Sequence, residues 1–581
     1  MKEENGRLFD PESAFSADDL VSVIRNAGPE TQADWLLKCI REGREIAGSP
    51  VNNKRRLPRT PPLCGDVLAM TMNVIPSEAK GSCGQSTQLR LSRIVHTLGS
   101  AIVKFGEEPG QRAGVRKILG TVYGRLTRRE KAWLASLGIA AGSAKSPRVW
   151  ANALHDAAFE NISRTIVYGQ EKRARRPQNA IRSDEIIWGR APVRLDLGGG
   201  WTDTPPYSLE NGGCVINAAV DLNGQPPIQV YARVIPEPVI RIYSIDHGAQ
   251  LTIRTMADLL DYRLPTSKFG LAKATLALCG FGPGEEGRRG GAGRGRAGRG
   301  ESLKERLKAF GGGIELSTLA AIPSGSGLGT SSIMGAVLMA VVHRMIGREV
   351  APRELFNLVL QLEQELTTGG GWQDQVGGVL PGVKMIRTEP GMVPDPRIHY
   401  VTADVLDPKG NLWNGGRIAG RTGGGADRLA NGGQTLLYYT GLRRLAKNIL
   451  RAVVGNYLDR DRDAIATLRE LREYPPKMSE AMAAKDMRRF GELIDLAWRL
   501  NKRIDPDSTT PVIESILERI KKHIWGAKLL GAGGGGFLLI VAKSPAEAAK
   551  VRRILEGAPP NDRARFFEYD VSREGLNVTV C

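Results

Sequence analysis

The sequence predicts an α+β fold with a mainly helical region in front of it, and two observations lead to this prediction. Up to about residue 180, apolar residues recur at helical spacing, as over residues 20–24 and 35–40. From residue 185 onward, short runs rich in Val, Ile and Tyr alternate with helical segments and glycine clusters. A charged, proline-bearing stretch over residues 171–184 is typical of a linker between the two parts.

The first part, residues 1–180, shows no group of residues with the spacing of a catalytic or metal site. A serine and two acidic residues at positions 16–19 are typical of a helix start. His96 and His155 have no paired ligand in the sequence around them. We therefore expect both histidines to be packed or surface side chains within a helical region.

The second part opens with five expected strands that are separated by Gly, Pro and Asn. These strands are Glu185–Trp188, Val193–Leu197, Cys214–Val220, Ile228–Arg233 and Val239–Tyr243. Strands and helices then alternate to about residue 395, and residues 440–525 read as largely helical. A strand–helix–strand section is expected from Ala527 to the end.

Composition and charge narrow the class of protein. Apolar residues make up 41% and charged residues 25% of the 581 residues, and 70 residues are glycine. A net charge of +19 is compatible with nucleic-acid binding, but no nucleic-acid motif accompanies it, so we expect an anionic small-molecule substrate instead. The six cysteines show no C-x-x-C spacing, and the longest apolar run, Ile333–Val342, is too short to span a membrane. With no signal peptide, these features predict a cytoplasmic protein without a membrane partner.

A Gly/Arg-rich segment over residues 282–300 has a composition that cannot form a hydrophobic core. One interpretation is an RNA-binding segment. No aromatic residue is interleaved to stack on bases, which favours a disordered surface insertion.

The first segment with chemical character is Arg190–Tyr207. An expected strand runs into three glycines and then delivers Asp203 and Tyr207. A carboxylate just past a strand end can accept hydrogen bonds from sugar hydroxyls, and glycines permit backbone conformations that other residues resist. A tight turn with solvated charges is the alternative interpretation.

The second segment, Pro323–Ser332, lies between an expected strand and an apolar helix. A glycine- and serine-rich loop that enters a helix N-terminus presents free N–H groups and the positive end of the helix dipole to a phosphate. It lacks the lysine of the G-x-x-x-x-G-K-[ST] motif. An ordinary glycine-rich turn that caps a buried helix is the alternative interpretation. The residues expected at a phosphate are Pro323, Gly325, Ser326, Gly327, Leu328, Gly329, Thr330, Ser331 and Ser332.

Two further segments complete the set. Asp374 lies among glycines over residues 369–378, where a carboxylate near a phosphate could take the proton of an attacking hydroxyl. A polar loop with a solvated aspartate is an equally good interpretation of this segment alone. The helical run 358–363 could bring Glu363 towards the phosphate as a Mg²⁺ ligand, although a solvated helix glutamate is nearly as good an interpretation. Residues 529–539 hold four consecutive glycines, which allow either close approach to a ligand or a packed glycine corner.

The order and spacing of these segments resemble the GHMP family of small-molecule kinases, whose three motifs occur in the same order. The first motif is matched by Arg190–Tyr207, the second by Pro323–Ser332 and the third by Gly531–Phe537. Within the family the chain is most similar to the kinase portion of L-fucokinases, as found in bifunctional fucokinase/GDP-fucose pyrophosphorylases. The strings that carry this similarity are residues 199–206, 325–332, 366–378 and 439–448.

The resemblance implies a two-lobed α/β fold with the active site between an N-terminal lobe, residues 185–395, and a C-terminal lobe, residues 396–581. It implies ATP and Mg²⁺ as cofactors and a sugar as substrate, with no nucleic-acid partner. Asp374 would be the base or orienting carboxylate, and Arg190 would lie near the sugar and the transferred phosphate. The residues implied at the sugar are Asp203, Gly200, Tyr207, Gly533 and Gly534, and those implied at the metal are Ser331, Ser332 and Glu363.

The implied reaction is phosphorylation of the anomeric hydroxyl of L-fucose. Galactokinases carry Glu-His where this chain has Gly200 and Trp201, and that glutamate is expected near a C6 hydroxyl, which L-fucose lacks. Another GHMP sugar kinase, such as a D-glycero-D-manno-heptose 7-phosphate kinase, is the nearest alternative. A family member that binds ligand without turnover, and an RNA-binding protein that uses residues 282–300, are the others.

Overall fold

The computed structural model describes most of the chain. The described residues are 83–107, 111–136, 139, 142, 145–168, 176–264, 267, 269–283, 301–323, 325–366, 369–406, 433–443 and 446–581. They form two compact units. The first holds the described residues up to Tyr168 together with Ala452–Ala466, and the second holds the others. Residues 284–300 of the expected insertion lie outside the described residues.

The first unit is helical, as expected, over its described residues. Its helices are α4 (Cys83–Glu107), α5 (Arg112–Arg125), α6 (Arg128–Ser136) and α7 (Pro147–Tyr168). A small apolar core, which includes Leu98, Leu119 and Trp150, holds them together. His96 bonds Asp459 through Nδ1 at 2.9 Å and stacks on His155 with ring centroids 4.1 Å apart. Both histidines are thus packed side chains of this unit.

The second unit contains three sheets. The largest has the strand order β15-β1-β4-β7-β5-β6, and all its neighbouring strands are antiparallel except β5 and β7. Its strands are β1 (Ile187–Ala191), β4 (Ile228–Ile235), β5 (Ile240–Ser244), β6 (Ala249–Ile253), β7 (Gly313–Ala320) and β15 (Asn577–Val580). The five expected strands between residues 185 and 243 are therefore confirmed, with two of them, β2 and β3, in the next sheet.

The second sheet has the order β14-β3-β8-β9, with β2 paired to β3, and the third has the order β11-β12-β10-β13. The second comprises β2 (Val193–Gly198), β3 (Cys214–Leu222), β8 (Val383–Arg387), β9 (Arg397–Val401) and β14 (Tyr569–Val571). The third comprises β10 (Thr435–Tyr439), β11 (Ile524–Leu529), β12 (Phe537–Ala542) and β13 (Arg565–Phe567). Strands β14 and β15, near the end of the chain, join the sheets built by residues 187–401, so the last residues of the chain complete the fold of the earlier ones.

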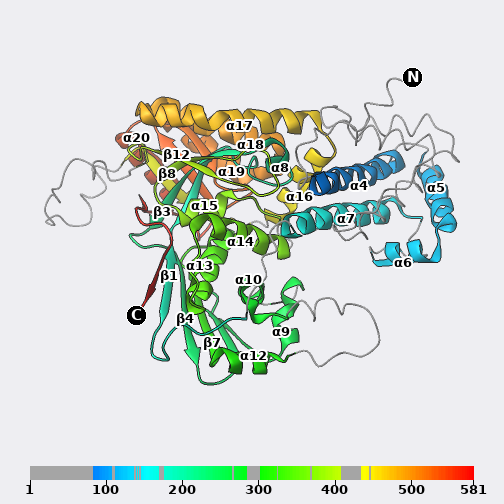
Figure 1. Ribbon diagram of the computed structural model, residues 1–581. Helices are drawn as coiled ribbons and strands as arrows, with labels where there is room; N and C mark the ends of the chain where they lie inside the picture. Colours follow the sequence, from blue (N-terminus) through cyan, green and yellow to red (C-terminus); the bar gives the residue numbers. More distant parts are fainter. Residues whose placement is uncertain are drawn as a thin grey trace. The chain divides into compact units, whose positions relative to one another are not determined.

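Helices accompany these sheets, and some of them pack directly on strands (Figure 1). They are α8 (Tyr207–Asn211), α9 (Met256–Leu260), α10 (Gly270–Leu276), α12 (Leu303–Phe310), α13 (Thr330–Met345), α14 (Pro352–Glu365), α15 (Gln373–Val379), α16 (Ala446–Leu458), α17 (Arg462–Ala483), α18 (Met487–Ile504), α19 (Pro511–Ile520) and α20 (Pro545–Gly557). Residues 452–466, at the end of α16 and the start of α17, belong to the first unit. The α+β class predicted from the sequence is confirmed.

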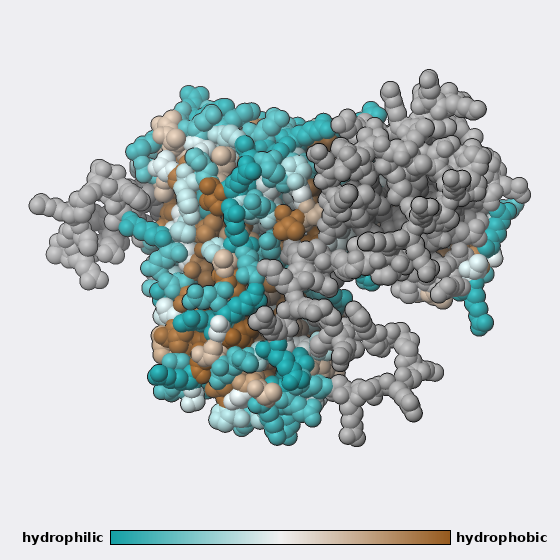
Figure 2. All heavy atoms as spheres, in the orientation of Figure 1, coloured by the Kyte–Doolittle hydropathy of each residue, from teal (hydrophilic) through white to brown (hydrophobic). Residues whose placement is uncertain are grey.

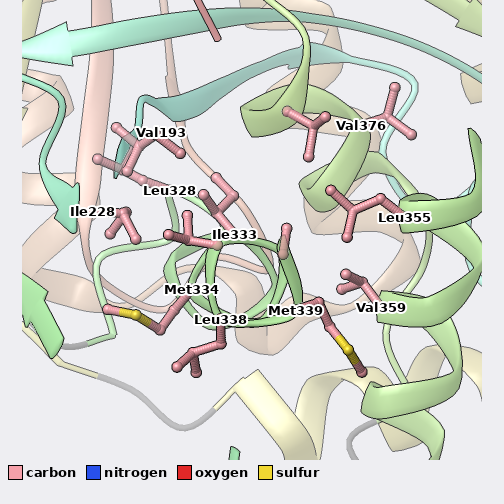
Figure 3. Close-up of a cluster of buried hydrophobic side chains, with 14 of the residues drawn as sticks. Val193, Ile228, Leu328, Ile333, Met334, Leu338, Met339, Leu355, Val359 and Val376 are labelled. Carbon is pink, nitrogen blue, oxygen red and sulfur yellow. The ribbon is translucent and has the colours of Figure 1, made fainter. Parts of the chain in front are cut away.

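Helix α13 is the centre of the main core. Its sequence is apolar on nearly every side, so it is buried by β1 and β4 on one side and by α14 and α15 on others. Figure 3 shows its Ile333, Met334 and Leu338 between Val193 and Ile228 of the sheets and Val359 of α14. The expected phosphate-binding segment is the loop directly before α13. The buried helix therefore holds one end of that loop in place.

Hydrophilic and hydrophobic residues are mixed over the coloured part of the face drawn in Figure 2. In the part of the chain that the structure describes, no helix is both long enough and apolar enough to cross a membrane.

We predict that Gly189→Ala destabilises the second unit by about 1–3 kcal/mol through overpacking. A Cβ atom at position 189 would overlap Val341 Cγ2 of α13 and lie 2.7 Å from Val337 Cγ1. Urea denaturation measures the effect. Gly557→Ala is the matched control, because an added Cβ there meets nothing within 4 Å, and equal losses in both variants would contradict the packing argument.

Candidate active site

A cavity of about 860 Å³ in the second unit brings the four sequence segments together. The site residues expected from the sequence that line it are Gly200, Asp203, Gly325, Ser326, Gly327, Gly329, Thr330, Ser331, Ser332, Glu363 and Asp374. Residues from β5, β6 and α10 extend its wall, as do Gly531 and Ala532 from the last glycine segment. The cavity therefore joins parts of the chain that are more than 300 residues apart.

The loop before α13 is shaped by three glycines. Gly325, Gly327 and Gly329 all have positive φ, at 69°, 78° and 74°, a conformation that glycine adopts at little cost. Gly329 is the N-cap of α13, so the first N–H groups of this sixteen-residue helix are free of intrahelical partners at the cavity. Ser326 and Thr330 hydroxyls lie 3.1 Å apart and close the loop on itself.

The last glycine segment supports this loop. A Cβ atom at Gly327 would overlap the carbonyl oxygen of Leu530, and one at Gly531 would lie 2.8 Å from the carbonyl oxygen of Gly327. Phe537 donates its backbone N–H to the carbonyl of Ser326 at 3.0 Å. The two glycine segments thus pack backbone against backbone, and of the last segment Gly531 and Ala532 reach the cavity wall.

An arginine that the sequence analysis did not select lies at the centre of the site. Arg194 of β2 contacts one oxygen of Asp374, with Nε and Nη2 at 2.8 and 2.6 Å from Oδ1, and donates Nη1–H to the carbonyl of Gly327 at 2.7 Å. Its side chain is 5% exposed, against 28% for Asp374. Burial alone would lower the pKa of Arg194, but the neighbouring carboxylates, Asp374 first, raise it. The guanidinium therefore ties the phosphate loop to the carboxylate of α15.

Asp203 is buried beside the start of α15. Its Oδ2 accepts the backbone N–H of Gln373 at 3.1 Å. A side chain at Gly371 would overlap that same oxygen, which explains a glycine at this position. Burial, reinforced by the charge of Asp374, raises the pKa of Asp203 to about 7.

Glu363 reaches the cavity from the last turns of α14. Its Oε1 accepts a hydrogen bond from the Ser332 hydroxyl. A Cβ atom at Gly370 would lie 2.7 Å from Oε2, so a side chain there would require the Glu363 carboxylate to shift. Burial raises the pKa of Glu363 to about 8, and the charges of Asp374 and Asp203 act in the same direction.

A buried ion pair lies beside these groups. Asp196 Oδ2 is 2.6 Å from Lys528 Nζ, and Oδ1 accepts a hydrogen bond from Gln373 Nε2 at 3.1 Å. Burial opposes ionisation of Asp196, yet Lys528 and Arg194 together lower its pKa. Arg194 and Asp196 are two residues apart on β2, and strand alternation that places both on one face could have indicated them in the sequence. Nothing in the sequence indicated Lys528.

Several expected site residues do not line the cavity. Arg190 lies elsewhere, with its guanidinium 4.6 Å above the Trp188 ring and 3.6 Å from a carboxylate oxygen of Glu574. It is displaced because positions 190 and 194 lie in different strands, β1 and β2. Tyr207 is buried at the start of α8.

The other exceptions lie just behind the cavity wall. Leu328 is buried beneath the phosphate loop, where its carbonyl accepts the Arg194 N–H, and Pro323 precedes the lining residues. Gly533 and Gly534 pack on Ser508, because an added Cβ at Gly533 would lie 2.5 Å from its carbonyl oxygen. These residues shape the site without forming its wall.

The donor set fits a hard divalent cation held partly by phosphate and water. Ser331, Ser332 and Glu363 offer oxygen ligands on one side of the cavity. Arg194 and Lys528 each pair with one carboxylate, Asp374 and Asp196, whereas burial first and neighbouring carboxylates second raise the pKa values of Asp203 and Glu363. Among the described residues no cluster of three His, Cys, Asp or Glu side chains could hold a metal by itself.

Two family matches coincide with this architecture. Residues 300–382 match the GHMP kinases N terminal domain, and residues 478–561 match GHMP kinases C terminal. The first match contains the phosphate loop, Glu363 and Asp374. The second contains Lys528 and the glycine segment that supports the loop.

Similar curated proteins include two bifunctional enzymes. The chain is 40% identical over 424 residues to the L-fucokinase/L-fucose-1-P guanylyltransferase of Bacteroides fragilis, which covers 73% of this chain and 41% of that protein. It is 32% identical over 394 residues to the bifunctional fucokinase/GDP-fucose pyrophosphorylase of Arabidopsis thaliana, covering 67% and 32%. The D-glycero-alpha-D-manno-heptose 7-phosphate kinase of Campylobacter jejuni is 24% identical over 39% of this chain. The matches thus span less than half of the length of either fucokinase protein.

We predict that Glu363→Gln makes the ligand-free protein less sensitive to rising pH. The pKa of Glu363 is about 8 in the folded chain, above its ordinary value of 4.5, so the folded state binds the extra proton and loses stability as pH rises from about 4.5 to 8. Glutamine removes that loss. At pH 8 in EDTA we expect the Tm of the variant to exceed that of wild type by about 2–6 °C, and the difference to shrink at pH 5. Parallel curves of Tm against pH would contradict this.

Proposed function

Because this chain carries the N-terminal and C-terminal domains of the GHMP kinases, we propose that it transfers the γ-phosphoryl group of ATP to the anomeric hydroxyl of L-fucose. The products are L-fucose 1-phosphate and ADP. The observation that carries the proposal is the Arg194–Asp374 ion pair, which lies beside the glycine-rich loop before α13. The similarity to two fucokinase proteins over about two thirds or more of the chain supports the choice of sugar.

The nucleotide would bind at the loop before α13. Its positive-φ glycines bring backbone N–H groups close to the phosphates, and the helix N-terminus favours their negative charge. Hydroxyl groups of Ser326, Thr330 and Ser331 add donors along the same wall. The loop keeps this shape without ligand, because Arg194 and the last glycine segment hold it from behind.

Ser331, Ser332 and Glu363 are the residues that would hold Mg²⁺. The ion, when bound, neutralises charge on the phosphate oxygens. Glu363 then keeps its carboxylate ionised at neutral pH, which burial opposes in the ligand-free chain. Gly370 leaves the space in which this carboxylate approaches.

The sugar would lie between Asp203 and Asp374. Asp203 can accept a hydrogen bond from a ring hydroxyl. Nε and Nη2 of Arg194 both contact Oδ1 of Asp374, so we assign Oδ2 as the oxygen that takes the proton of the anomeric hydroxyl. Arg194 orients this carboxylate and stabilises charge on the transferred group.

Gly200 fits a substrate without a C6 hydroxyl. A Cβ atom there would lie 3.0 Å from Asp196 Oδ2, so a longer side chain would have to turn into the sugar space or displace a buried carboxylate. A polar side chain built to bond a hydroxyl that L-fucose lacks would be left without a partner, at about 1–3 kcal/mol.

The test is ADP release from purified protein with Mg²⁺-ATP and a panel of sugars. D-Arabinose lacks C6, L-fucose carries a methyl group there and L-galactose a hydroxymethyl group, so the three isolate the effect of C6. We expect kcat/KM to be highest for L-fucose. Turnover with D-glycero-D-manno-heptose 7-phosphate alone would mean that this heptose phosphate, and not L-fucose, is the substrate. If no sugar is phosphorylated, a protein that binds ligands without catalysis is favoured.

We predict that Asp374→Asn lowers kcat by ~10²–10⁴ while the protein folds and binds ATP normally, because the variant cannot accept the hydroxyl proton. Steady-state kinetics measure kcat, and calorimetry measures ATP affinity. Asp395→Asn is the matched control, since that exposed carboxylate only pairs with Arg353 at 3.2 Å. Turnover like that of wild type in Asp374→Asn would remove Asp374 from the mechanism.

A further inference from the structure

Lys528 is buried in the second unit and, among the residues that the structure describes, pairs with one carboxylate. Its side chain is 1% exposed, and its Nζ lies 2.6 Å from Asp196 Oδ2 and 3.0 Å from the backbone carbonyl oxygen of the same residue. It belongs to β11, whereas Asp196 belongs to β2, 332 residues earlier. Two bonds to one residue fix the ammonium group, so the pair links β2, the strand that carries Arg194, to β11 of the third sheet.

The other oxygen of Asp196 leads directly to the reacting groups. Oδ1 accepts from the Gln373 side chain, and the Gln373 backbone N–H donates to Asp203. Gln373 is the first residue of α15 and precedes Asp374. A continuous line of contacts therefore runs from Lys528 through Asp196 to both carboxylates that we assign to the sugar.

Asp196 is also close to Arg194, the cation that pairs with Asp374. Arg194 lies two residues before it on β2, and the charge of Asp196 is among those that raise the pKa of Arg194. The titratable groups that face Asp196 are Lys528 from β11, Arg194 from its own strand, Asp203 beyond the glycine turn and Tyr474 from α17. Of these four groups, Lys528 and Arg194 are cations. Lys528 can neutralise the charge of Asp196 without taking Arg194 away from Asp374.

We propose that Lys528 is a positioning residue for phosphoryl transfer, which keeps Asp196 ionised and thereby fixes Gln373 and reserves Arg194 for Asp374. The inference rests on the proposed kinase function. Lys528 touches neither substrate nor reacting atoms in this scheme. It acts because a buried carboxylate without its cation must find another one or take up a proton.

Removing Lys528 therefore has two consequences that depend on pH. At high pH Asp196 stays ionised and competes with Asp374 for Arg194. At low pH Asp196 is protonated, and its neutral carboxyl can still accept from Gln373. Replacing both charged residues removes the competition altogether, because a buried pair replaced as a unit leaves no uncompensated charge.

The experiment compares Lys528→Met, Asp196→Asn and the double variant with wild type, using the sugar that wild type phosphorylates. For Lys528→Met at pH 8 we expect kcat to fall about 10–100-fold through misplacement of the reacting groups, with KM for ATP nearly unchanged. We expect kcat of the double variant to be at least about fivefold higher than kcat of Lys528→Met, and a double-mutant cycle reports this difference as a coupling between the two residues. Lys543→Met, on an exposed lysine, is the control.

The pH profile separates positioning from general loss of structure. In Lys528→Met, kcat relative to wild type should rise as pH falls from 8 to 6, and in the double variant this ratio should be independent of pH. A kcat for Lys528→Met equal to wild type, or a double variant no better than the single one, would overturn the proposal.

Two further results are also decisive. If Lys528→Met does not fold, the double variant supplies the test, and a kcat more than about 100-fold below wild type would overturn the proposal. A wild-type chain that phosphorylates no sugar refutes the proposed function and this inference together. Sugar turnover by wild type that is insensitive to Lys528 refutes the inference alone.

Discussion

Buried negative charge at the base of the cavity is the constraint on which the site depends. Asp196, Asp203 and Glu363 are removed from water, and carboxylates in such surroundings ionise only beside a cation or strong donors. Lys528 and Arg194 each pair with one carboxylate, Asp196 and Asp374, and the pKa values of Asp203 and Glu363 rise. A cation bound beside Asp203 and Glu363 would therefore favour their ionised forms.

Such crowding of carboxylates is possible because the backbone leaves them room. Gly370 and Gly371 lie against Glu363 and Asp203 at distances that no Cβ atom would tolerate. Gly327 and Gly531 let two loops that are about 200 residues apart in the sequence pack backbone against backbone. Glycine here serves mainly to bring polar groups and main chains within contact distance, and the packing of α13 keeps the assembly from moving apart.

The class of the fold and most of the residues of the site could be predicted from the sequence. Strand patterns over residues 185–243 and the apolar helix after the phosphate loop correspond to β1–β5 and α13, because local periodicity and punctuation reflect which faces are buried. Glycine-flanked polar residues such as Asp203 and Asp374 were recognisable since motif and spacing are properties of one segment. Residues 1–82, where further helices were expected, lie outside the described residues.

Contacts between distant segments were decided by the tertiary structure alone. Arg190 and Arg194 are equally plausible in the sequence, and only the break between β1 and β2 places the second beside Asp374 and the first beside Trp188. The role of Lys528 depends on its pairing with Asp196, which lies 332 residues earlier in the chain. A sequence pattern reports periodicity within a segment, whereas the pairing of two buried charges depends on which strands the whole chain brings together, and that is fixed by packing.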